Sequence, residues 1–362
     1  MPTPVIEYLR ELVALSGPSG AEEDVIRAIA QRVRPLVDTL ELDPFGNLIA
    51  VRRGATPDAR RCAIAVHMDE IGFRVRKIEQ EGYLRFEKVG GSDNRVLLAQ
   101  RVWVRTGQGR LLGVIGTKSA HLLKDADRTS VPPHTEQYID IGARDRADAE
   151  RMGVRLGDPA GFVGELAELG LGSGRYTAHA LDDRAGCAIL LAALDELRGQ
   201  PLPVTVVALF TVQEEVGLRG AQAVIQGQGA DVGLAVDTTA LDDTPEIGTY
   251  NLRLGSGPAI KIMDASTLAH PAVRRALTKA AEAAGVAAQH EILTGIGTDA
   301  GALQFGGGGV PAGTISLGTR YTHSPVEVLD KGDLEGAARL LREFLLALPE
   351  TDLRFTALDG PD

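Results

Sequence analysis

Side chains that can bind metal ions or move protons follow the short apolar segments of this sequence. They are His67, Glu214, Glu215 and Asp237. The best-defined segment, Val204–Phe210, is rich in β-branched residues, which is typical of a strand buried on both faces at the centre of a parallel sheet. Because the carboxyl ends of parallel strands meet at one edge of a sheet, we expect these side chains to lie close together. Adjacent carboxylates there would repel unless a cation or a shared proton offset their charge.

Further residues complete a candidate metal site. The pair Asp182-Asp183 stands just before a predicted helix, and His323 follows the last apolar strand segment. Imidazole and carboxylate together suit a borderline divalent ion such as Zn, Co or Mn. Two histidines and three carboxylates exceed the needs of one open catalytic ion, whereas two ions at ~3.5–4 Å that share a carboxylate would use them all. Asp69, two residues after His67, would point the same way and accept the second imidazole N–H.

Each acidic pair also has an ordinary structural interpretation. An Asp-Asp pair before a helix is often an N-cap and a first-turn acid that interacts with the helix dipole. For Asp183 we weigh this structural role equally with a role in the site. A Glu-Glu pair alone is often part of a solvated loop, but the buried strand before Glu214 favours a site. His179, near the Asp pair, is assigned a structural role.

The elements that must position these residues show two different patterns. Residues 1–71 and 166–362 mix helical periodicity with short apolar strands, which predicts one discontinuous α/β domain with a mostly parallel sheet sandwiched by helices. Residues 72–165 alternate apolar and polar side chains between glycine turns, which predicts an inserted, small, barrel-like β domain. Helices are predicted at residues 5–16, 20–37, 184–198, 267–284 and 332–348. Ser19 and Glu22 form a predicted capping box for the second of them.

Composition and charge narrow the classes of protein. The chain has 362 residues, enough for two domains or one domain with a large insertion, and a net charge of −11. Such an acidic protein is a poor candidate for binding nucleic acid or an anionic membrane. No segment approaches the ~20 apolar residues that span a bilayer, and Cys62 and Cys187 stand outside any Cys-x-x-Cys pair. We therefore expect buried free thiols and a cytoplasmic protein without nucleic-acid or membrane partners.

Five short motifs, spread over nearly the whole chain, together point to a known family. They are His67–Phe73, Ala180–Arg184, Gln213–Gly220, Ala235–Asp237 and Arg320–Pro325. In these motifs and their order the sequence resembles the tetrahedral, self-compartmentalising metalloaminopeptidases, which include glutamyl aminopeptidases and proteins once described as cellulases. Any one motif alone would be weak, whereas jointly they are specific. The predicted β insertion also falls where this family has one.

The resemblance implies a di-zinc peptidase fold and a set of metal ligands. Asp182 would bridge two divalent ions. His67 and Asp237 would complete one of them, and Glu215 and His323 would complete the other. Zinc is the first expectation for both ions, with cobalt or manganese as alternatives. The family also has a cis peptide bond after the bridging aspartate.

The implied activity is the removal of N-terminal residues from peptides with a free N-terminus. Two cations would lower the pKa of a shared water, so that hydroxide is available as the nucleophile near neutral pH. Glu214 would act as general base and pass the proton to the departing amine, while Asp69 orients His67. One ion would polarise the scissile carbonyl and the other would anchor the free α-amine. The family builds a twelve-subunit hollow tetrahedron from dimers joined through the inserted domain, so we expect a homo-oligomer of this kind.

Four more residues are candidates for contact with substrate, and two of them have a structural alternative. Asp299, between glycines, either lines the specificity pocket or caps a helix after a turn. Arg320 and Tyr321 precede a predicted ligand and are assigned to substrate binding. His121, in the predicted β domain, either reaches the site of a neighbouring subunit or has an ordinary core or surface role.

Three other functions stay open at this point. A related two-metal deacylase or carboxypeptidase-type amidohydrolase would use the same ligands. A glycosidase with two bare carboxylates would leave His67 and His323 without a role. A non-catalytic metal-binding scaffold would have no use for Glu214 as a base.

Overall fold

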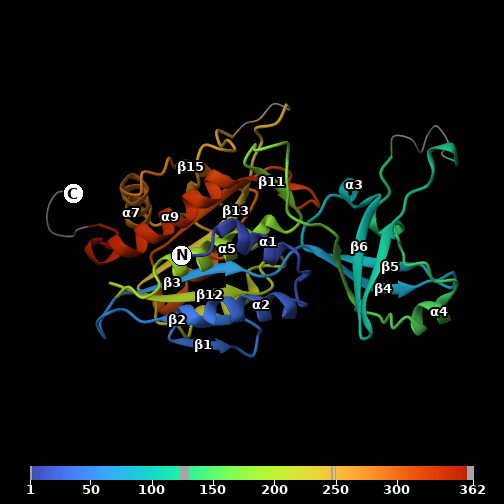
Figure 1. The fold of residues 1–362 in the computed structure, drawn as a ribbon, viewed down its shortest axis with the longest axis horizontal. Coiled ribbons are helices and arrows are strands. Elements are labelled where there is room, and N and C mark those ends of the chain that lie inside the picture. The colour runs from blue at the N-terminus through green and yellow to red at the C-terminus, as the bar shows by residue number, and fades with distance from the viewer. Residues whose placement is uncertain (1, 123–129, 246–247, 249, 357–362) are drawn as a thin grey trace.

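The computed structural model describes residues 2–122, 130–245, 248 and 250–356. A body of helices around a large sheet and a closed β-barrel lie side by side along the long axis of the molecule (Figure 1). The chain leaves the body after strand β3 (Arg61–His67) and is back in it at helix α5 (Leu181–Glu196). This is the fold class that the sequence predicts, an α/β body with an inserted barrel.

The large sheet has four parallel strands at its centre, flanked by antiparallel pairs on both sides, and its last pair is parallel again. Its order is β1 (Thr39–Leu42), β2 (Leu48–Arg52), β12 (Thr205–Thr211), β3, β13 (Val232–Ala240), β16 (Ala312–Thr319), β14 (Ala259–Met263) and β15 (Gln289–Ile292). Strands β12, β3, β13 and β16 run parallel to one another, and Thr211 pairs with His67. The carboxyl ends of β12 and β3 therefore lie level, next to β13, which sets the edge where the predicted ligands can meet.

Helices cover both faces of this sheet, one face more thickly than the other. The thick layer and the main core are formed by α1 (Val5–Val13), α2 (Glu23–Val33), α5, α7 (Pro271–Ala283) and α9 (Lys331–Ala347). The other face packs against α6 (Arg219–Ile225) and α8 (Ala300–Leu303). Along β3, Ile64 faces the thick layer while Ala63 and Ala65 face the thin one, because successive strand residues point to opposite faces. Both faces are buried, which explains the unbroken apolar runs in the sequence.

The barrel has a core of its own, separate from that of the body. Its closed order is β4 (Gly72–Ile78), β5 (Leu84–Val89), β8 (Ile139–Asp140), β7 (Gly109–Ile115), β6 (Gln100–Thr106) and β9 (Pro159–Phe162). Phe73 packs edge-on against Phe86 and Phe162, with ring centroids 4.9 and 5.3 Å apart. Two short helices, α3 (Asn94–Leu97) and α4 (Arg146–Arg151), interrupt a region where the sequence predicts almost pure alternation.

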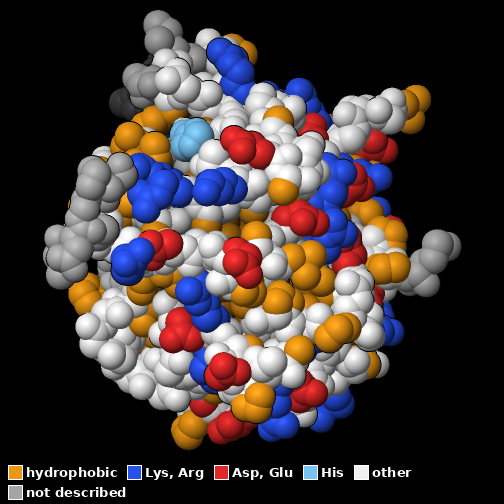
Figure 2. Space-filling view, turned by 90° about the vertical axis from the view of Figure 1, so that its left-hand side faces the viewer, with side chains coloured by type: hydrophobic (Ala, Val, Ile, Leu, Met, Phe, Trp, Pro, Cys, Tyr) orange, Lys and Arg blue, Asp and Glu red, His pale blue; other side chains and the backbone are white. Residues whose placement is uncertain are grey.

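A small antiparallel sheet joins the segment that returns from the barrel to the C-terminal part of the body. Its strands are β10 (Ala167–Glu168), β11 (Arg175–Ala178) and β17 (Glu327–Asp330). Within the part of the chain that the structure describes, no helix combines the length and apolar character needed to cross a lipid bilayer. On the end of the body away from the barrel, basic and acidic side chains are interspersed rather than gathered by sign (Figure 2).

The structure corrects several predicted element boundaries. Helix α2 begins at Glu23 and has no capping box, because Ser19 donates its hydroxyl to Asp69 at 2.6 Å and Glu22 accepts the N–H of Gly20 at 2.7 Å. Both side chains are turned toward the buried edge of the sheet and away from the helix. Asp237 does not end its strand, since β13 continues to Ala240. The other predicted helices begin or end a few residues away from the expected positions.

Candidate metal centre

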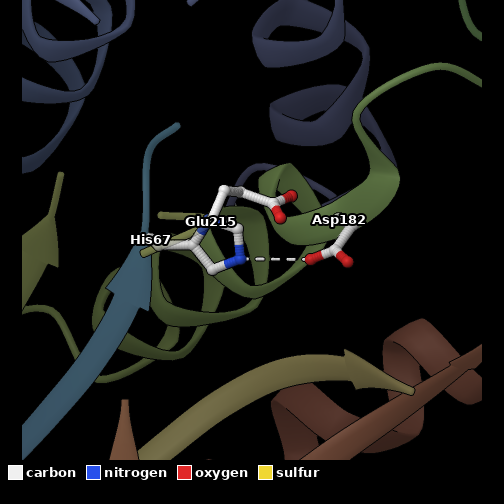
Figure 3. A group of neighbouring side chains, drawn as sticks. All are labelled: His67, Asp182 and Glu215. Carbon is white, nitrogen blue, oxygen red and sulfur yellow. Dashed lines mark hydrogen bonds and ion pairs between the residues drawn. The ribbon is translucent and has the colours of Figure 1, made fainter. Parts of the chain in front are cut away.

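The carboxyl edge of the central strands brings the predicted ligands together. His67 is the last residue of β3, Glu214 and Glu215 follow β12 by a few residues, and Asp237 projects from β13. Asp182 belongs to the non-helical first turn of α5, where the peptide bond to Asp183 is cis, as the family resemblance implies. Figure 3 shows His67, Asp182 and Glu215 pointing toward one another from these different elements.

The Asp182 carboxylate lies between the two imidazoles. Its Oδ1 is 3.1 Å from Nε2 of His67, and its Oδ2 is 3.3 Å from Nε2 of His323. His67 Nε2 is also 3.7 Å from Asp237 Oδ1, and His323 Nε2 is 3.2 Å from Glu215 Oε2. Each imidazole therefore shares Asp182 and has one further carboxylate as its own partner.

The donor atoms fit metal ions. Two overlapping groups have ligand atoms within 4.8 Å of one another, His67 with Asp182 and Glu215, and His67 with Asp183 and Asp237. Glu215 Oε1 is buried and has no hydrogen-bond partner among the described residues, although a buried carboxylate oxygen normally has one. Imidazole and carboxylate are also the ligand types that borderline divalent ions prefer.

Hydrogen bonds with the neighbouring acids favour the protonated form of the imidazoles. Burial alone would lower the pKa of His323, but hydrogen bonds with Asp182 and Glu215 raise it to about 12. Burial would raise the pKa of Asp182, but the two histidines hold it well below its usual range. Since metal-bound histidine is neutral, metal binding would release these protons, and a cation would take over the charge balance.

Glu214 reaches the same cavity without being part of either ligand group. The cavity has a volume of about 470 Å³, and the side chains lining it include His67, Asp237 and Glu214. Burial raises the pKa of Glu214 well above its usual range, and the nearby acids Asp237 and Asp299 add to the shift, while His67 opposes it. A carboxylate with a raised pKa at the wall of such a cavity suits proton transfer near neutral pH.

Asp69 is hydrogen-bonded to the turn that carries Glu214 and Glu215. Its Oδ1 accepts the backbone N–H of Glu214 at 3.0 Å, and its Oδ2 accepts that of Glu215 at 3.2 Å. The nearer partner of the His67 Nδ1 atom is the backbone oxygen of Asp69 at 3.1 Å, and the Asp69 carboxylate is 3.5 Å away. One residue therefore orients the imidazole and also holds the turn that carries the glutamates.

Glu327, which sequence reasoning missed, fixes two ligands at once. Its Oε1 accepts the backbone N–H of His323 at 2.7 Å, and its Oε2 accepts that of Asp182 at 3.1 Å. The side chain is 2% exposed. A charged residue between the apolar neighbours Val326 and Val328 was the one available signal for it. Asp183 is likewise buried, and it accepts the N–H of Gly186 at 2.8 Å, which is the bond of a helix start.

The predicted substrate residues lie at different distances from the cavity. Asp299 is 2% exposed at the N-cap position of α8, where its carboxylate makes no capping bond and accepts the hydroxyl of Thr211 at 2.5 Å; burial raises its pKa to about 7. Arg320 is paired through Nε and Nη2 with Asp243 at 2.6 and 2.8 Å. Neither side chain lines the 470 Å³ cavity.

Tyr321 and His121 are both exposed. Tyr321 lies beside the predicted ligand His323 and lines a second cavity there. His121 lies in a single turn, Ala120–Leu122, of the inserted segment and does not line the cavity of its own chain. Its reach into a neighbouring subunit stays a prediction.

Comparison with known proteins decides the family. A family model described as M42 glutamyl aminopeptidase matches residues 46–340. The chain belongs to this family. The M42 chain is 33% identical to the glutamyl aminopeptidase of Lactococcus lactis subsp. cremoris over 346 residues, which cover 95% of each protein.

Two solved structures are similar to this one over almost the whole chain. The aminopeptidase APDkam598 of the archaeon Desulfurococcus kamchatkensis is 41% identical, with a TM-score of 0.89 over 94% of both chains. The TET1 peptidase of Pyrococcus horikoshii is 35% identical, with a TM-score of 0.85 over 94% of this chain and 99% of the other. The predicted resemblance and the predicted class of enzyme are confirmed: this M42 protein is an aminopeptidase of a metallopeptidase family.

Proposed function

We propose that this M42 aminopeptidase removes N-terminal residues from peptides with the help of two divalent ions. The observation that carries the proposal is the position of Asp182, whose two carboxylate oxygens face the two imidazoles separately at 3.1 and 3.3 Å. A bridging carboxylate between two half-sites is the arrangement that two-metal hydrolases use. Asp182, His67 and Asp237 would hold one ion, and Asp182, Glu215 and His323 would hold the other.

The chain's own residues divide the work of hydrolysis. When bound, the pair of ions lowers the pKa of a water and polarises the scissile carbonyl. Glu214 accepts the proton that the attacking water loses and returns it to the nitrogen of the departing peptide. Asp69 keeps Glu214 in place through the backbone N–H at 3.0 Å.

A substitution at Glu214 tests the base. Glu214→Gln keeps the shape of the side chain and leaves the metal ligands intact, so both ions should be retained. Turnover of an aminoacyl chromogenic substrate should fall by roughly 10²–10⁴-fold. Metal content per subunit and kcat are measured on the same preparation. Near-normal turnover with both ions present would refute the assignment of Glu214.

Metal content and a substrate panel test the rest of the activity. We expect two ions per subunit, zinc first, with cobalt or manganese as alternatives. Peptides with a free N-terminus should be hydrolysed and their acetylated counterparts should not. Hydrolysis confined to blocked peptides would instead indicate a deacylase, and activity that survives chelation would indicate chemistry without metal.

The proposal extends to assembly and location. The related Pyrococcus horikoshii TET1 peptidase can assemble into a tetrahedron or a large octahedral shell, which supports a dodecamer built from dimers, with residues 72–165 as the contact domain. Light scattering that showed a stable monomer in the metal-loaded form would contradict it. Cys62 and Cys187 are buried free thiols, which supports a cytoplasmic location. Cell fractionation tests that location.

A further inference from the structure

A second cavity continues from the metal site into the junction between body and barrel. We call it the interdomain groove. It has a volume of about 480 Å³ and shares Thr322 and His323 with the metal cavity. Its other lining residues come from both parts of the molecule: Gly91, Ser92, Asp93, Arg95 and Val96 from the barrel, and Tyr321, Ser324 and Val326 from the body.

The barrel wall of the groove lies beside the proposed metal ligands, and a hydrogen bond within the barrel holds part of this wall. A β-carbon added to Gly91 would lie 3.6 Å from Nδ1 of His323, and one added to Gly90 would lie 3.3 Å from Cβ of Glu215. Lys88 donates from Nζ to the backbone oxygen of Ser92 at 2.6 Å. The inserted barrel therefore lies against two of the proposed metal ligands.

The metal cavity and the groove meet at Thr322 and His323, and part of their remaining lining differs in exposure. The metal cavity extends past Asp237 to Thr239, whose hydroxyl donates to Glu291 at 2.7 Å. Thr239 and Glu291 are each 1% exposed, so this part of the cavity wall is buried. The groove instead ends among exposed side chains, since Tyr321 is 52% and Val326 is 56% exposed.

An enzyme that removes one residue at a time needs this asymmetry. The N-terminal residue would lie in the cavity at the metal site, and the remaining peptide must leave toward solvent. The open path past His323 is the interdomain groove. We propose that the groove binds the side chain of the residue that follows the scissile bond, and that it prefers uncharged, apolar residues there. This inference rests on the proposed aminopeptidase function.

The chemistry of the lining supports an apolar preference. Tyr321, Val326 and Val96 supply apolar surface on both walls, and covering such surface stabilises a complex by about 25 cal/mol per Å². The charged groups of the groove are already paired with each other, Arg95 Nη2 with Asp93 Oδ2 at 2.6 Å. Neither Arg95 nor Asp93 therefore offers an unpaired charge to a charged substrate residue.

Charge substitutions on the two walls test the proposal. The substrates are peptides with one fixed N-terminal residue followed by Leu, Glu or Lys, and the readout is the ratio of kcat/KM values between them. Wild-type enzyme should prefer Leu. Val326→Lys should shift the Glu-to-Leu ratio upward by roughly tenfold, and Val326→Glu should do the same for Lys. Arg95→Ala, on the barrel wall, frees Asp93 and should also favour Lys.

Two controls separate the groove from other causes. Ile296→Ala, in the metal cavity, should change the preferred N-terminal residue and leave the ratios for the next residue unaltered. Leu42→Lys adds the same charge as Val326→Lys at an exposed position of β1, outside the groove, and should leave every ratio unchanged. Equal effects of Val326→Lys and Val326→Glu on all substrates, or no effect of either, would overturn the proposed role of the groove. A wild-type enzyme that cleaves no free N-terminus would overturn the proposed function as well.

Discussion

At the scale of single residues, the site depends on a carboxylate that binds no metal in our proposal. Glu327 accepts backbone N–H groups from both Asp182 and His323, which lie on different elements. Glu327→Ala removes both bonds, so we expect metal affinity to fall by roughly 10–100-fold. Glu327→Gln should have a smaller effect, because its amide still offers one oxygen acceptor. Titration of metal into the chelated protein measures both.

Helix α9 offers a matched control for this prediction. Glu335 is an exposed glutamate whose ion pair with Lys331 spans 3.5 Å, and such a surface pair contributes little to stability. Glu335→Ala should leave metal affinity unchanged. Equal affinities for the Glu327 and Glu335 variants would show that the backbone bonds of Glu327 do not matter for metal binding.

A second buried acid, Glu22, should make stability depend on pH. Burial raises the pKa of Glu22 to about 7, and the charge of Asp69 adds to the shift. The unfolded chain has the ordinary value near ~4.3. Between these values the folded state binds more protons than the unfolded state, so the free energy of unfolding falls as pH rises and reaches its low plateau above about pH 7.

Replacing this acid should remove that pH dependence. Glu22→Gln keeps an oxygen acceptor for the N–H groups of Gly20 and Gln213 and cannot ionise. We expect a gain at pH 8 of up to about 3 kcal/mol in the free energy of unfolding and little gain at pH 4. Denaturant unfolding over a pH series measures it. Glu23→Gln, at the neighbouring exposed position, should give a profile parallel to wild type; a parallel profile for Glu22→Gln would contradict the prediction.

Some residues of the site could be predicted from the sequence and others could not. The difference is how far the position of each residue depends on tertiary packing. His67 and Glu215 could be predicted, because each follows an apolar strand and the ends of parallel strands meet. Glu327 could not, since its role depends on how a short antiparallel strand lies against the start of α5. Asp299 was assigned to a pocket or a cap; it stands at the N-cap position of α8, but its carboxylate accepts the hydroxyl of Thr211 and makes no capping bond.

At the scale of elements, the close approach of α5 to β13 sets the position of Asp182. Gly186 lies in the first turns of α5, and a β-carbon there would overlap the Asp183 carboxylate and lie 2.6 Å from the backbone oxygen of Val236. Gly186→Ala should therefore push the helix start away from the sheet. We expect a loss of about 1–3 kcal/mol in the free energy of unfolding, as for other overpacked interiors, together with weaker metal binding.

Thermal or denaturant unfolding and metal titration check this prediction together. Gly107 is the matched control, because a β-carbon added there meets nothing within 4 Å. Gly107→Ala should change neither quantity. If Gly186→Ala kept the stability and the metal affinity of the wild type, the helix start would have adapted without moving Asp182, and the prediction would be wrong.

Element boundaries show where sequence patterns stop being informative. The apolar runs predicted the central strands well, because both of their faces are buried. The capping box was wrong because the acid and hydroxyl that suit a helix end also suit the buried turn at Asp69, and only the fold decides between these partners. Strands as short as β8 and β10 carry too few residues to show an alternation.

At the scale of the whole molecule, the inserted barrel has two tasks in our proposals. One wall lines the interdomain groove, and the remaining surface is available for contacts between subunits. The two tasks need a fixed orientation between barrel and body. Gly72 at the start of β4 packs against Pro18, and Arg74 donates to the backbone oxygen of Ser19 at 2.9 Å, so contacts on both sides of the junction hold it.

Removal of the metal should lower the stability of the whole molecule as well as stop turnover. Five acids, Asp182, Asp183, Glu214, Glu215 and Asp237, lie around the proposed ions, so bound cations would offset the repulsion between them. Ligands that bind only the native state stabilise it by about 4 kcal/mol at a thousandfold excess over Kd. We expect chelation to lower the melting temperature by several degrees and zinc to restore it, with hydrolysis returning in parallel.

His323→Ala removes one ligand of the second ion and should respond less to chelation than wild type, whereas the exposed variant Glu335→Ala should respond fully. Melting curves that stayed unchanged on chelation, in a sample shown by elemental analysis to have lost its metal, would mean that the buried acids need no cation to pack.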